Sequence, residues 1–207
     1  MMNKKVMNEQ EKFWKGKFGN SYIFRNNNKK LIESNKKIFL KIKKQIMKSN
    51  SVLEFGCNIG LNLIALKNIN SKLDLNGVDI NKKAIDILKK NKYINVFNES
   101  ILNFEPKDKY DMTFIKGVLI HINPKELDNL YDKLYNYSNK YIYIAEYYNP
   151  SPIKLSYRGF KNKLFKRDFA GEILDKFRGL NLVDYGFAYH RDKFPQDDLN
   201  WFLLEKK

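Results

Sequence analysis

Apolar residues along this chain switch repeatedly between the spacing of a helix and the short continuous runs that are typical of buried strands. A helical pattern covers residues 30–47, where the apolar positions are Leu31, Ile32, Ile38, Phe39, Ile42 and Ile46. Short apolar runs predict strands at 51–55, 73–79, 93–98, 110–115, 141–146, 180–190 and 198–205. Further helices are predicted at 60–67, 82–90, 123–137 and 166–177. Asn123-Pro124 marks a helix start, with an N-cap side chain and a proline at the first helical position.

The order of these elements predicts an α/β fold. Strands that alternate with helices form βαβ units, and such strands run parallel in one sheet. The last two predicted strands are joined by a short turn, so they pair antiparallel. We expect one domain over residues 1–207, in which 1–48 form an N-terminal cap and helix and 49–207 form the core. The cap is the aromatic and polar segment 8–28, with a turn expected at Gly19-Asn20.

The composition limits where the chain works. Hydrophobic residues make up 43% of the sequence, which is enough to build a core. No apolar run approaches the length of a membrane span and no apolar stretch follows the first charged residues, so we expect a cytoplasmic protein without a signal peptide. Cys57 is the single cysteine, which excludes an internal disulfide and a cysteine-built metal site. Histidines and carboxylates do not cluster in the sequence, and we expect no metal.

The net charge of +16 raises the question of a nucleic-acid partner. Five of the 39 basic residues are arginines and the rest are lysines. Many of these lysines are scattered as pairs along the predicted helices, where a solvated face explains them. We therefore expect no nucleic-acid partner, although the long-range field of the charge favours small anionic substrates.

The segment VLEFGCNIG at 52–60 carries the strongest functional signal. It ends a predicted strand, and ligands of doubly wound sheets bind at the carboxyl ends of the strands. Gly56 would let the backbone turn and approach a ligand closely, and Gly60 would allow tight contact between helix and strand. Glu54 places a carboxylate just before the turn, which suits a cationic amino-acid ligand better than a phosphate. Asp79 ends the next strand with an acid suited to a ribose diol.

Two other interpretations of this segment remain open from the residues. In the first, the segment is a structural glycine turn and Glu54 caps the following helix. In the second, the chain is a nicotinamide-dependent enzyme, which the spacing disfavours because the third glycine of the dinucleotide pattern is missing.

EFGCNIG is similar to motif I of the class I S-adenosylmethionine-dependent methyltransferases, with Asn58 in place of the middle glycine. Asparagine tolerates left-handed backbone, so the turn can survive. The resemblance implies a Rossmann-like fold with a mainly parallel seven-stranded sheet, a terminal antiparallel hairpin and helices on both faces. The implied cofactor is S-adenosyl-L-methionine (SAM), whose product is S-adenosyl-L-homocysteine (SAH).

The same resemblance assigns roles around the cofactor. It implies that Glu54 lies at the methionine part, that Asp79 holds the ribose hydroxyls, and that Ser100 lies near the adenine amine, where many relatives have Asp. After the fourth strand, Lys116-Gly117-Val118 should pass beneath the cofactor. The implied cofactor residues are Glu54, Gly56, Cys57, Asn58, Gly60, Asp79, Ile80, Ser100, Ile101, Lys116 and Gly117.

Longer phrases of the chain resemble the methylases associated with pseudaminic acid biosynthesis. These phrases are EQEKFWKGKFGNSYIFRN, FIKGVLIHINP, IAEYYNPSP, LFKRDFAGE, LVDYGFAYHRD and FPQDDLNWFLLEK. The resemblance implies that the acceptor is a small anionic sugar or a nucleotide-linked sugar precursor of a bacterial surface glycan. A methyltransferase acting on protein or another small metabolite, and a non-catalytic cofactor-binding protein, are the alternatives.

Methyl transfer to a hydroxyl needs a base that removes the proton. The candidates are His121 after the fourth strand, Glu146 at the end of the fifth and His190 at the end of the sixth. Histidine can act as a base near neutral pH. Alternatively, His121 helps to cap the helix that begins at Pro124.

Arginine is rare in this chain, and its planar fork binds carboxylate or phosphate bidentately. The candidate substrate-binding residues are therefore Arg25, Arg158, Arg167 and Arg191, together with the tyrosines Tyr22, Tyr147, Tyr148 and Tyr157, which could stack on a sugar. Surface salt bridges and core packing are the alternative roles of these side chains.

Overall fold

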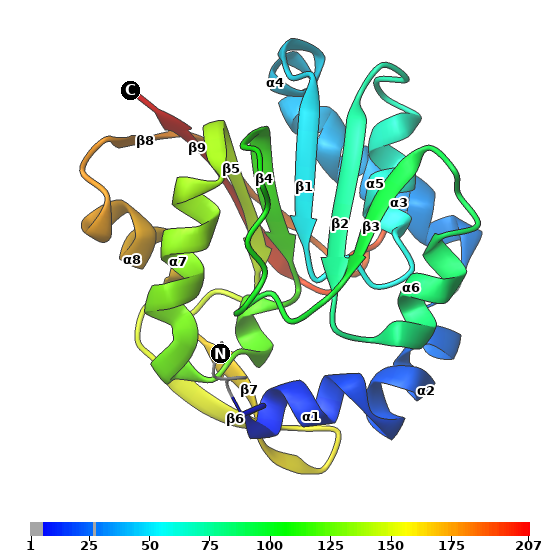
Figure 1. The fold of residues 1–207 in the computed structure, drawn as a ribbon. Helices are drawn as coiled ribbons and strands as arrows, with labels where there is room; N and C mark the ends of the chain where they lie inside the picture. Colours follow the sequence, from blue (N-terminus) through cyan, green and yellow to red (C-terminus); the bar gives the residue numbers. More distant parts are fainter. Residues whose placement is uncertain (1–5, 27) are drawn as a thin grey trace.

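The computed structural model describes residues 6–26 and 28–207, and a seven-stranded sheet lies at its centre (Figure 1). The strand order is β3-β2-β1-β4-β5-β9-β8. The strands are β1 Ser51–Phe55, β2 Asp74–Asp79, β3 Ile94–Asn98, β4 Tyr110–Lys116, β5 Ser138–Glu146, β8 Leu180–Ala188 and β9 Leu199–Lys206. Strands β1 to β5 pair in parallel, whereas β9 pairs antiparallel with both β5 and β8. The predicted parallel sheet and its terminal antiparallel hairpin are thus confirmed.

Helices cover both faces of this sheet (Figure 1). One face carries α3 Lys29–Phe39, α4 Lys43–Lys48, α5 Leu61–Lys67 and α6 Lys82–Leu88, and the other carries α7 Leu127–Asn136 and α8 Phe169–Lys176. Each face has its own apolar core, because alternate side chains of the strands point to opposite sides. Among the described residues, no helix is long and apolar enough to cross a membrane.

Most predicted helix boundaries lie close to the observed ones, with two corrections. The helix expected over 30–47 is interrupted by a 3₁₀ turn, η1 Leu40–Ile42, between α3 and α4. The helix expected from 166 begins only at Phe169, because the Asp168 side chain caps it by accepting from the Gly171 N–H at 2.8 Å. The start at Asn123 is confirmed as a 3₁₀ turn, η3 Pro124–Glu126, that leads into α7.

The N-terminal cap consists of two helices, α1 Glu9–Lys15 and α2 Lys17–Arg25. The turn expected at Gly19-Asn20 is wrong, because both residues lie inside α2. A Cβ on Gly19 would lie 1.8 Å from the carbonyl oxygen of Trp14 and 2.8 Å from Nδ2 of Asn81. The glycine is therefore a point of close contact between the cap and the core.

A second hairpin, for which the sequence pattern predicts no strand, consists of β6 Ile153–Tyr157 and β7 Phe160–Lys166. Its two-residue turn places Arg158 and Gly159 at φ values of 49° and 84°. The hairpin lies beside α1 at the carboxyl edge of the sheet (Figure 1). There, Gln10 Nε2 donates to the carbonyl of Asn162 at 3.1 Å. The N-terminal cap and this hairpin together cover the edge where the strands β1, β2 and β4 end.

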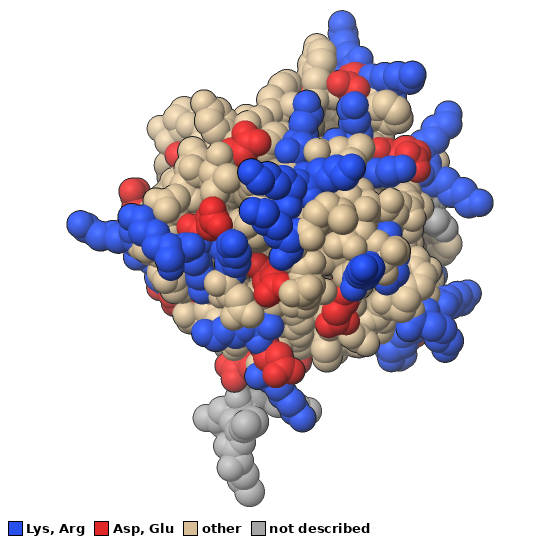
Figure 2. Space-filling model, turned by 90° about the horizontal axis from the view of Figure 1, so that it is seen from above, with Lys and Arg blue, Asp and Glu red and all other residues tan. Residues whose placement is uncertain are grey.

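Lysine and arginine side chains are spread over the face seen in Figure 2, where acidic side chains are interspersed among them. Several lysines form pairs with neighbouring acids, such as Lys82 with Asp86 and Lys140 with Glu205. These pairs and the acids interspersed in Figure 2 agree with the expectation that many of the lysines belong to solvated surfaces.

Candidate active site

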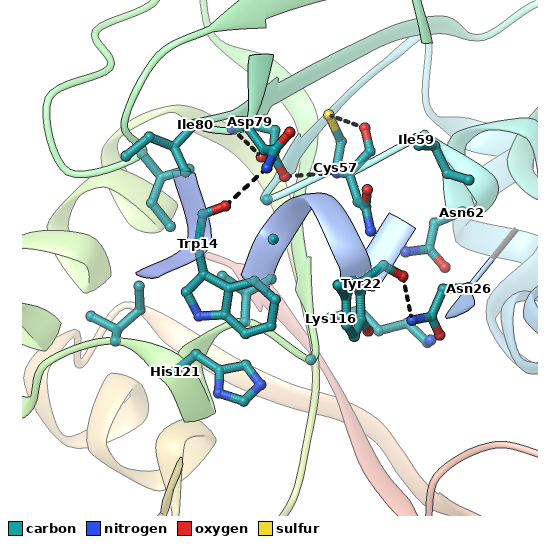
Figure 3. A pocket seen from close by; sticks show the side chains of 18 of the residues that line it. Trp14, Tyr22, Asn26, Cys57, Ile59, Asn62, Asp79, Ile80, Lys116 and His121 are labelled. Atoms are coloured by element: carbon teal, nitrogen blue, oxygen red, sulfur yellow. Dashed lines mark hydrogen bonds between the residues drawn. The ribbon is translucent and has the colours of Figure 1, made fainter. Parts of the chain in front are cut away.

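A pocket lies at the carboxyl ends of β1, β2 and β4, beneath the N-terminal cap (Figure 3). It brings together many of the residues that the sequence singles out, namely Tyr22, Gly56, Cys57, Asn58, Asp79, Ile80, Ser100, Ile101, Lys116, Gly117 and His121. In Figure 3 Asp79 and His121 lie on opposite sides of the pocket, with Trp14 between them. Nine of the eleven predicted cofactor residues and one predicted base therefore line a single pocket, whereas Glu54 and Gly60 do not line it.

The loop after β1 has the left-handed backbone that its sequence suggests. Gly56, Asn58 and Gly60 have φ values of 78°, 47° and 77°, so the prediction that Asn58 tolerates this conformation is confirmed. The close contacts differ from the expectation. A Cβ on Gly56 would lie 2.6 Å from a methyl of Val118, and one on Gly60 would lie 2.3 Å from a methyl of Leu88 in α6. These glycines bring the loop against neighbouring protein segments.

Glu54 is buried beside this loop with an incomplete set of hydrogen bonds. Its Oε1 accepts from Nδ2 of Asn62 at 2.6 Å. Its Oε2 and the Oδ1 of Asn62 are buried and have no hydrogen-bond partner. Burial raises the pKa of Glu54 to about 8, against the opposing effects of the Asn62 hydrogen bond and the Lys116 charge. Two adjacent unpaired acceptors fit a ligand group with several N–H donors, such as an α-ammonium.

The prediction that Glu54 caps a helix is wrong, because α5 begins at Leu61 after its N-cap Gly60 and the Glu54 carboxyl accepts from the Asn62 side chain, not from a backbone N–H. Lys116 lies at the end of β4 and lines the pocket near Glu54. Burial lowers its pKa, although the Glu54, Asp197 and Glu146 charges act in the opposite direction. A cation beside the unpaired acceptors fits the carboxylate of an amino-acid ligand.

Asp79 connects the loops that follow β1 and β2. Its Oδ2 accepts from the backbone N–H of Asn58 at 2.8 Å, and its Oδ1 accepts from that of Asn81 at 2.7 Å. Burial raises the pKa of Asp79 despite these hydrogen bonds. Each carboxylate oxygen retains a further lone pair, so the side chain can accept from ligand hydroxyls while it holds both loops.

His121 lies on the opposite side of the pocket and is 6% exposed. Its Nδ1 is 2.5 Å from the carbonyl oxygen of Lys163. A carbonyl oxygen only accepts, so Nδ1 carries the proton and Nε2 keeps a free lone pair. Burial lowers the pKa of His121 to about 4, so the ring is neutral at physiological pH. The ring also packs at 4.7 Å from each of the rings of Trp14 and Tyr157.

Asn123, rather than His121, caps the turn at Pro124, since its side chain accepts from the Lys125 N–H. The capping interpretation of His121 is therefore wrong. Glu146 does not line the pocket. Its carboxylate accepts backbone N–H bonds from Val118 and Leu119, both at 2.9 Å, and from Ile120 at 3.5 Å. The structure thus gives Glu146 the role of holding the turn that carries His121.

The predicted tyrosines and arginines separate into two groups. Tyr22, Tyr147 and Tyr157 lie close enough to interact electrostatically, and burial raises the pKa of both Tyr22 and Tyr147. Arg25 lies 5.7 Å from the ring centre of Tyr22, and Arg158 lies 5.8 Å from that of Tyr157. Both arginine charges act on the hydroxyl of Tyr22. We call these five residues the tyrosine–arginine wall. Tyr22 lines the pocket, whereas the other four do not, and both arginines are exposed.

The second group consists of Tyr148, Arg167 and Arg191, none of which lines the pocket. Nε of Arg167 donates to Glu172 at 2.6 Å, so Arg167 has the alternative role of a surface salt bridge. Arg191 is exposed between β8 and β9, and Tyr148 is 40% exposed against Phe202. His190 follows the end of β8 rather than ending it, and its ring pairs at 2.8 Å with Asp198. The structure therefore does not bring the four arginines or the two histidines to one site.

Sequence reasoning missed several side chains of the pocket. They are Asn8, Gln10, Glu11, Trp14, Asn26, Asn35, Asn62, Asn81, Gln196 and Asp197. Most lie on the N-terminal cap, on α3 and α5, and in the loop before β9, and not directly after a strand. In the described part of the chain, no three His, Cys, Asp or Glu side chains are placed to hold a metal ion. Burial raises the pKa of Cys57 far above its usual range, so its thiol stays protonated.

Residues 52–140 match the protein family described as "Methyltransferase domain". Among solved structures, the chain is similar to magnesium protoporphyrin IX methyltransferase from Synechocystis PCC 6803 with bound SAM, at 11% identity and a TM-score of 0.69, covering 99% of this chain and 100% of that chain. It is also similar to the plantazolicin methyltransferase BpumL with SAH, at 17% identity and a TM-score of 0.68, covering 96% and 94%. A third similar structure is the glycopeptide N-methyltransferase MtfA with SAH, at 8% identity and a TM-score of 0.66, covering 84% and 89%. Comparison with curated proteins gives no match.

The fold agrees with the match of residues 52–140 to a methyltransferase domain. The chain has the fold of the class I methyltransferases, as the sequence predicts. The match over residues 52–140, together with neighbours that hold SAM or SAH, supports a SAM-dependent methyltransferase with SAM as its cofactor. The names of the neighbours refer to a porphyrin, plantazolicin and a glycopeptide, so the shared fold leaves the acceptor open.

Proposed function

We propose that this chain transfers the methyl group of SAM, in the cytoplasm, to a small anionic acceptor that is a sugar or a nucleotide-linked sugar precursor of a bacterial surface glycan. The observation that carries the methyl-transfer part is the pair of unpaired buried acceptors, Glu54 Oε2 and Asn62 Oδ1. Asn62 and Asp79 line the pocket, and Glu54 is buried behind Asn62, to which it is hydrogen-bonded. When bound, SAM supplies an electrophilic methyl group on its sulfonium.

The residues present fit the three polar parts of this cofactor. Glu54 and Asn62 would hold the α-ammonium, because both offer an unpaired oxygen. Lys116 would hold the α-carboxylate. Asp79 would accept from the ribose hydroxyls through the lone pairs that its two backbone hydrogen bonds leave free.

His121 is our candidate for the base. Its Nδ1–H is held by the Lys163 carbonyl, so Nε2 presents a lone pair that can take the proton of an acceptor hydroxyl. The rings of Trp14 and Tyr157 enclose it and limit the access of water. Glu146 acts on this step through the turn that it hydrogen-bonds.

Two features support an anionic sugar as the acceptor. The first is the resemblance of the chain to the methylases associated with pseudaminic acid biosynthesis. The second is the tyrosine–arginine wall, in which Arg25 and Arg158 flank the rings of Tyr22 and Tyr157. Tyrosine faces suit a sugar ring, and arginine forks suit its carboxylate or a linked phosphate.

The test is incubation of the protein with labelled SAM and a panel of free and nucleotide-linked nine-carbon sugar acids. We expect label in an anionic sugar, and a KM raised at least about tenfold in Arg25→Lys and Arg158→Lys, because lysine keeps the charge but loses the fork. Arg191→Lys is the matched control, since Arg191 is exposed on the turn after β8 and, unlike Arg25 and Arg158, does not pack on a tyrosine ring of the wall. Wild-type KM values in both wall variants would contradict recognition by arginine. Failure of every sugar to take up label would contradict the proposed acceptor class.

A further inference from the structure

The pocket continues past Asp79 to an end that lies between α1 and the loop after β3. The pocket lining includes Ile80, Ser100 and Leu102 of the core and Gln10 and Glu11 of α1, and the hydrogen bond between Ser100 and Glu11 places α1 beside the loop after β3. With the amino-acid part of the cofactor at Glu54 and its ribose at Asp79, the base must lie at this end. The position of the base therefore rests on the proposed function.

Glu11 is the carboxylate at this end of the pocket. Its Oε1 accepts from Oγ of Ser100 at 2.5 Å, and its Oε2 accepts from the backbone N–H of Asn8 at 2.8 Å. The first bond joins α1 to the core, and the second belongs to the capping box that starts the helix. Each oxygen therefore has a fixed position and a lone pair left over, as Asp79 has at the ribose.

Gln10 supplies an independent sign that this part of the pocket is built for a donor. The side chain is 5% exposed, and its Nε2 donates to the carbonyl of Asn162 at 3.1 Å. That bond fixes the orientation of the amide and leaves Oε1 as an acceptor, which is buried and has no partner. A buried acceptor without a donor costs free energy unless a ligand supplies one.

We propose that α1 forms the base-recognition site of the cofactor, in which Glu11 and Gln10 accept the two N–H groups of the exocyclic amine of adenine. The apolar side chains of Ile80 and Leu102 contact the rings, and Ser100 positions the Glu11 carboxylate. The N-terminal cap thereby decides which nucleoside is accepted, although it lies outside residues 52–140 of the family match.

The experiment compares the affinities of the protein for SAH and for S-inosylhomocysteine, in which a carbonyl replaces the amine. We expect wild-type protein to prefer SAH at least about tenfold, since the carbonyl oxygen would face two acceptors. Glu11→Gln should weaken SAH binding at least about tenfold and abolish the preference, while glutamine preserves the capping box. Gln10→Met, which removes the second acceptor, should reduce the preference in the same direction.

Glu9→Gln is the matched control, because Glu9 lies on the same helix, pairs with Lys163 and does not line the pocket. It should keep both the SAH affinity and the preference. A wild-type preference that survives in both Glu11→Gln and Gln10→Met would overturn this inference and leave the proposed function intact. Wild-type protein that binds neither SAH nor SAM would overturn the proposed function and this inference with it.

Discussion

Binding of SAH should release a proton from Glu54. Burial raises the pKa of this carboxyl to about 8, so most of the protein carries a neutral Glu54 at pH 7. The cofactor brings an α-ammonium to the unpaired oxygen of that side chain. A cation beside this carboxyl group stabilises its ionised form, so Glu54 should lose its proton when the ligand binds.

The number of protons released depends on the pKa of Glu54 in the free protein and on its pKa in the SAH complex. With a pKa of about 8, Glu54 holds about 0.9 of a proton at pH 7 in the free protein. An adjacent opposite charge lowers a carboxyl pKa by about 1–3 units, so the complex should release about 0.4 to 0.9 of a proton at pH 7. The same shift should tighten SAH binding roughly 5- to 50-fold between pH 6 and pH 8.

Calorimetry at pH 7 in two buffers with different heats of ionisation measures this release directly. Glu54→Gln is the control, because glutamine cannot titrate and the variant keeps Asp79, whose pKa is also raised by burial. The variant should bind SAH more weakly at pH 8 and show no release from this position. A wild-type protein that releases no proton, with a Kd that is flat from pH 6 to pH 8, would refute the assignment of Glu54 to the ammonium.

Three further predictions concern other parts of the site. Asp79→Ala should weaken SAH binding, measured by calorimetry, at least tenfold, because a charge-assisted contact worth about 1.5–3 kcal/mol is lost. Unchanged affinity would contradict the assignment of Asp79 to the ribose hydroxyls. His121→Ala should lower turnover roughly 10²-fold at unchanged SAH affinity. Since the pKa of His121 is about 4, wild-type turnover at saturating SAM should show no loss from protonation of His121 above pH 5. A loss of turnover centred near pH 6.5 under these conditions would contradict the burial argument. Gly60→Ala should lower the free energy of unfolding by about 1–3 kcal/mol more than Gly159→Ala. Both glycines have positive φ, but only Gly60 faces a packed side chain, that of Leu88. Equal denaturant midpoints of the two variants would show that the Leu88 side chain moves aside without cost.

The inner strands β1, β4 and β5 could be predicted because they are buried on both faces and form short apolar runs between helical patterns. The hairpin of β6 and β7 could not, because most of β6 is exposed and offers no alternation of buried and exposed positions. Helix α2 was not predicted because Gly19-Asn20 looks like a turn signal. Position 19 of α2 is occupied by a glycine because any larger residue would collide with the carbonyl oxygen of Trp14. Tertiary contact, rather than local propensity, explains that glycine.

The candidate site divides in the same way. Asp79 is the last residue of β2, and His121 follows β4. Because the carboxyl ends of parallel strands meet at one edge of the sheet, the position of both residues in one pocket could be predicted. Asn62, Gln10 and Glu11 lie on helices, and which helical face meets the pocket depends on packing that the sequence does not reveal. His190 was misplaced because β8 ends at Ala188, two residues earlier than predicted, and Asp198 then holds its ring.

Lys163 joins the segments that surround the acceptor side of the pocket. Its buried ammonium pairs with Glu9 of α1, and its backbone carbonyl holds Nδ1 of His121. The cap and the hairpin both lie outside residues 52–140, where the family match is found. Neighbours that share the fold have names that refer to different acceptors, so the common core does not determine the acceptor. In this chain the residues that would discriminate between acceptors must therefore be sought on α1, α2, the β6–β7 hairpin and the loop before β9. Trp14, Tyr157 and the two arginines of the wall lie on the first three of these segments, and Gln196 and Asp197 lie on the fourth.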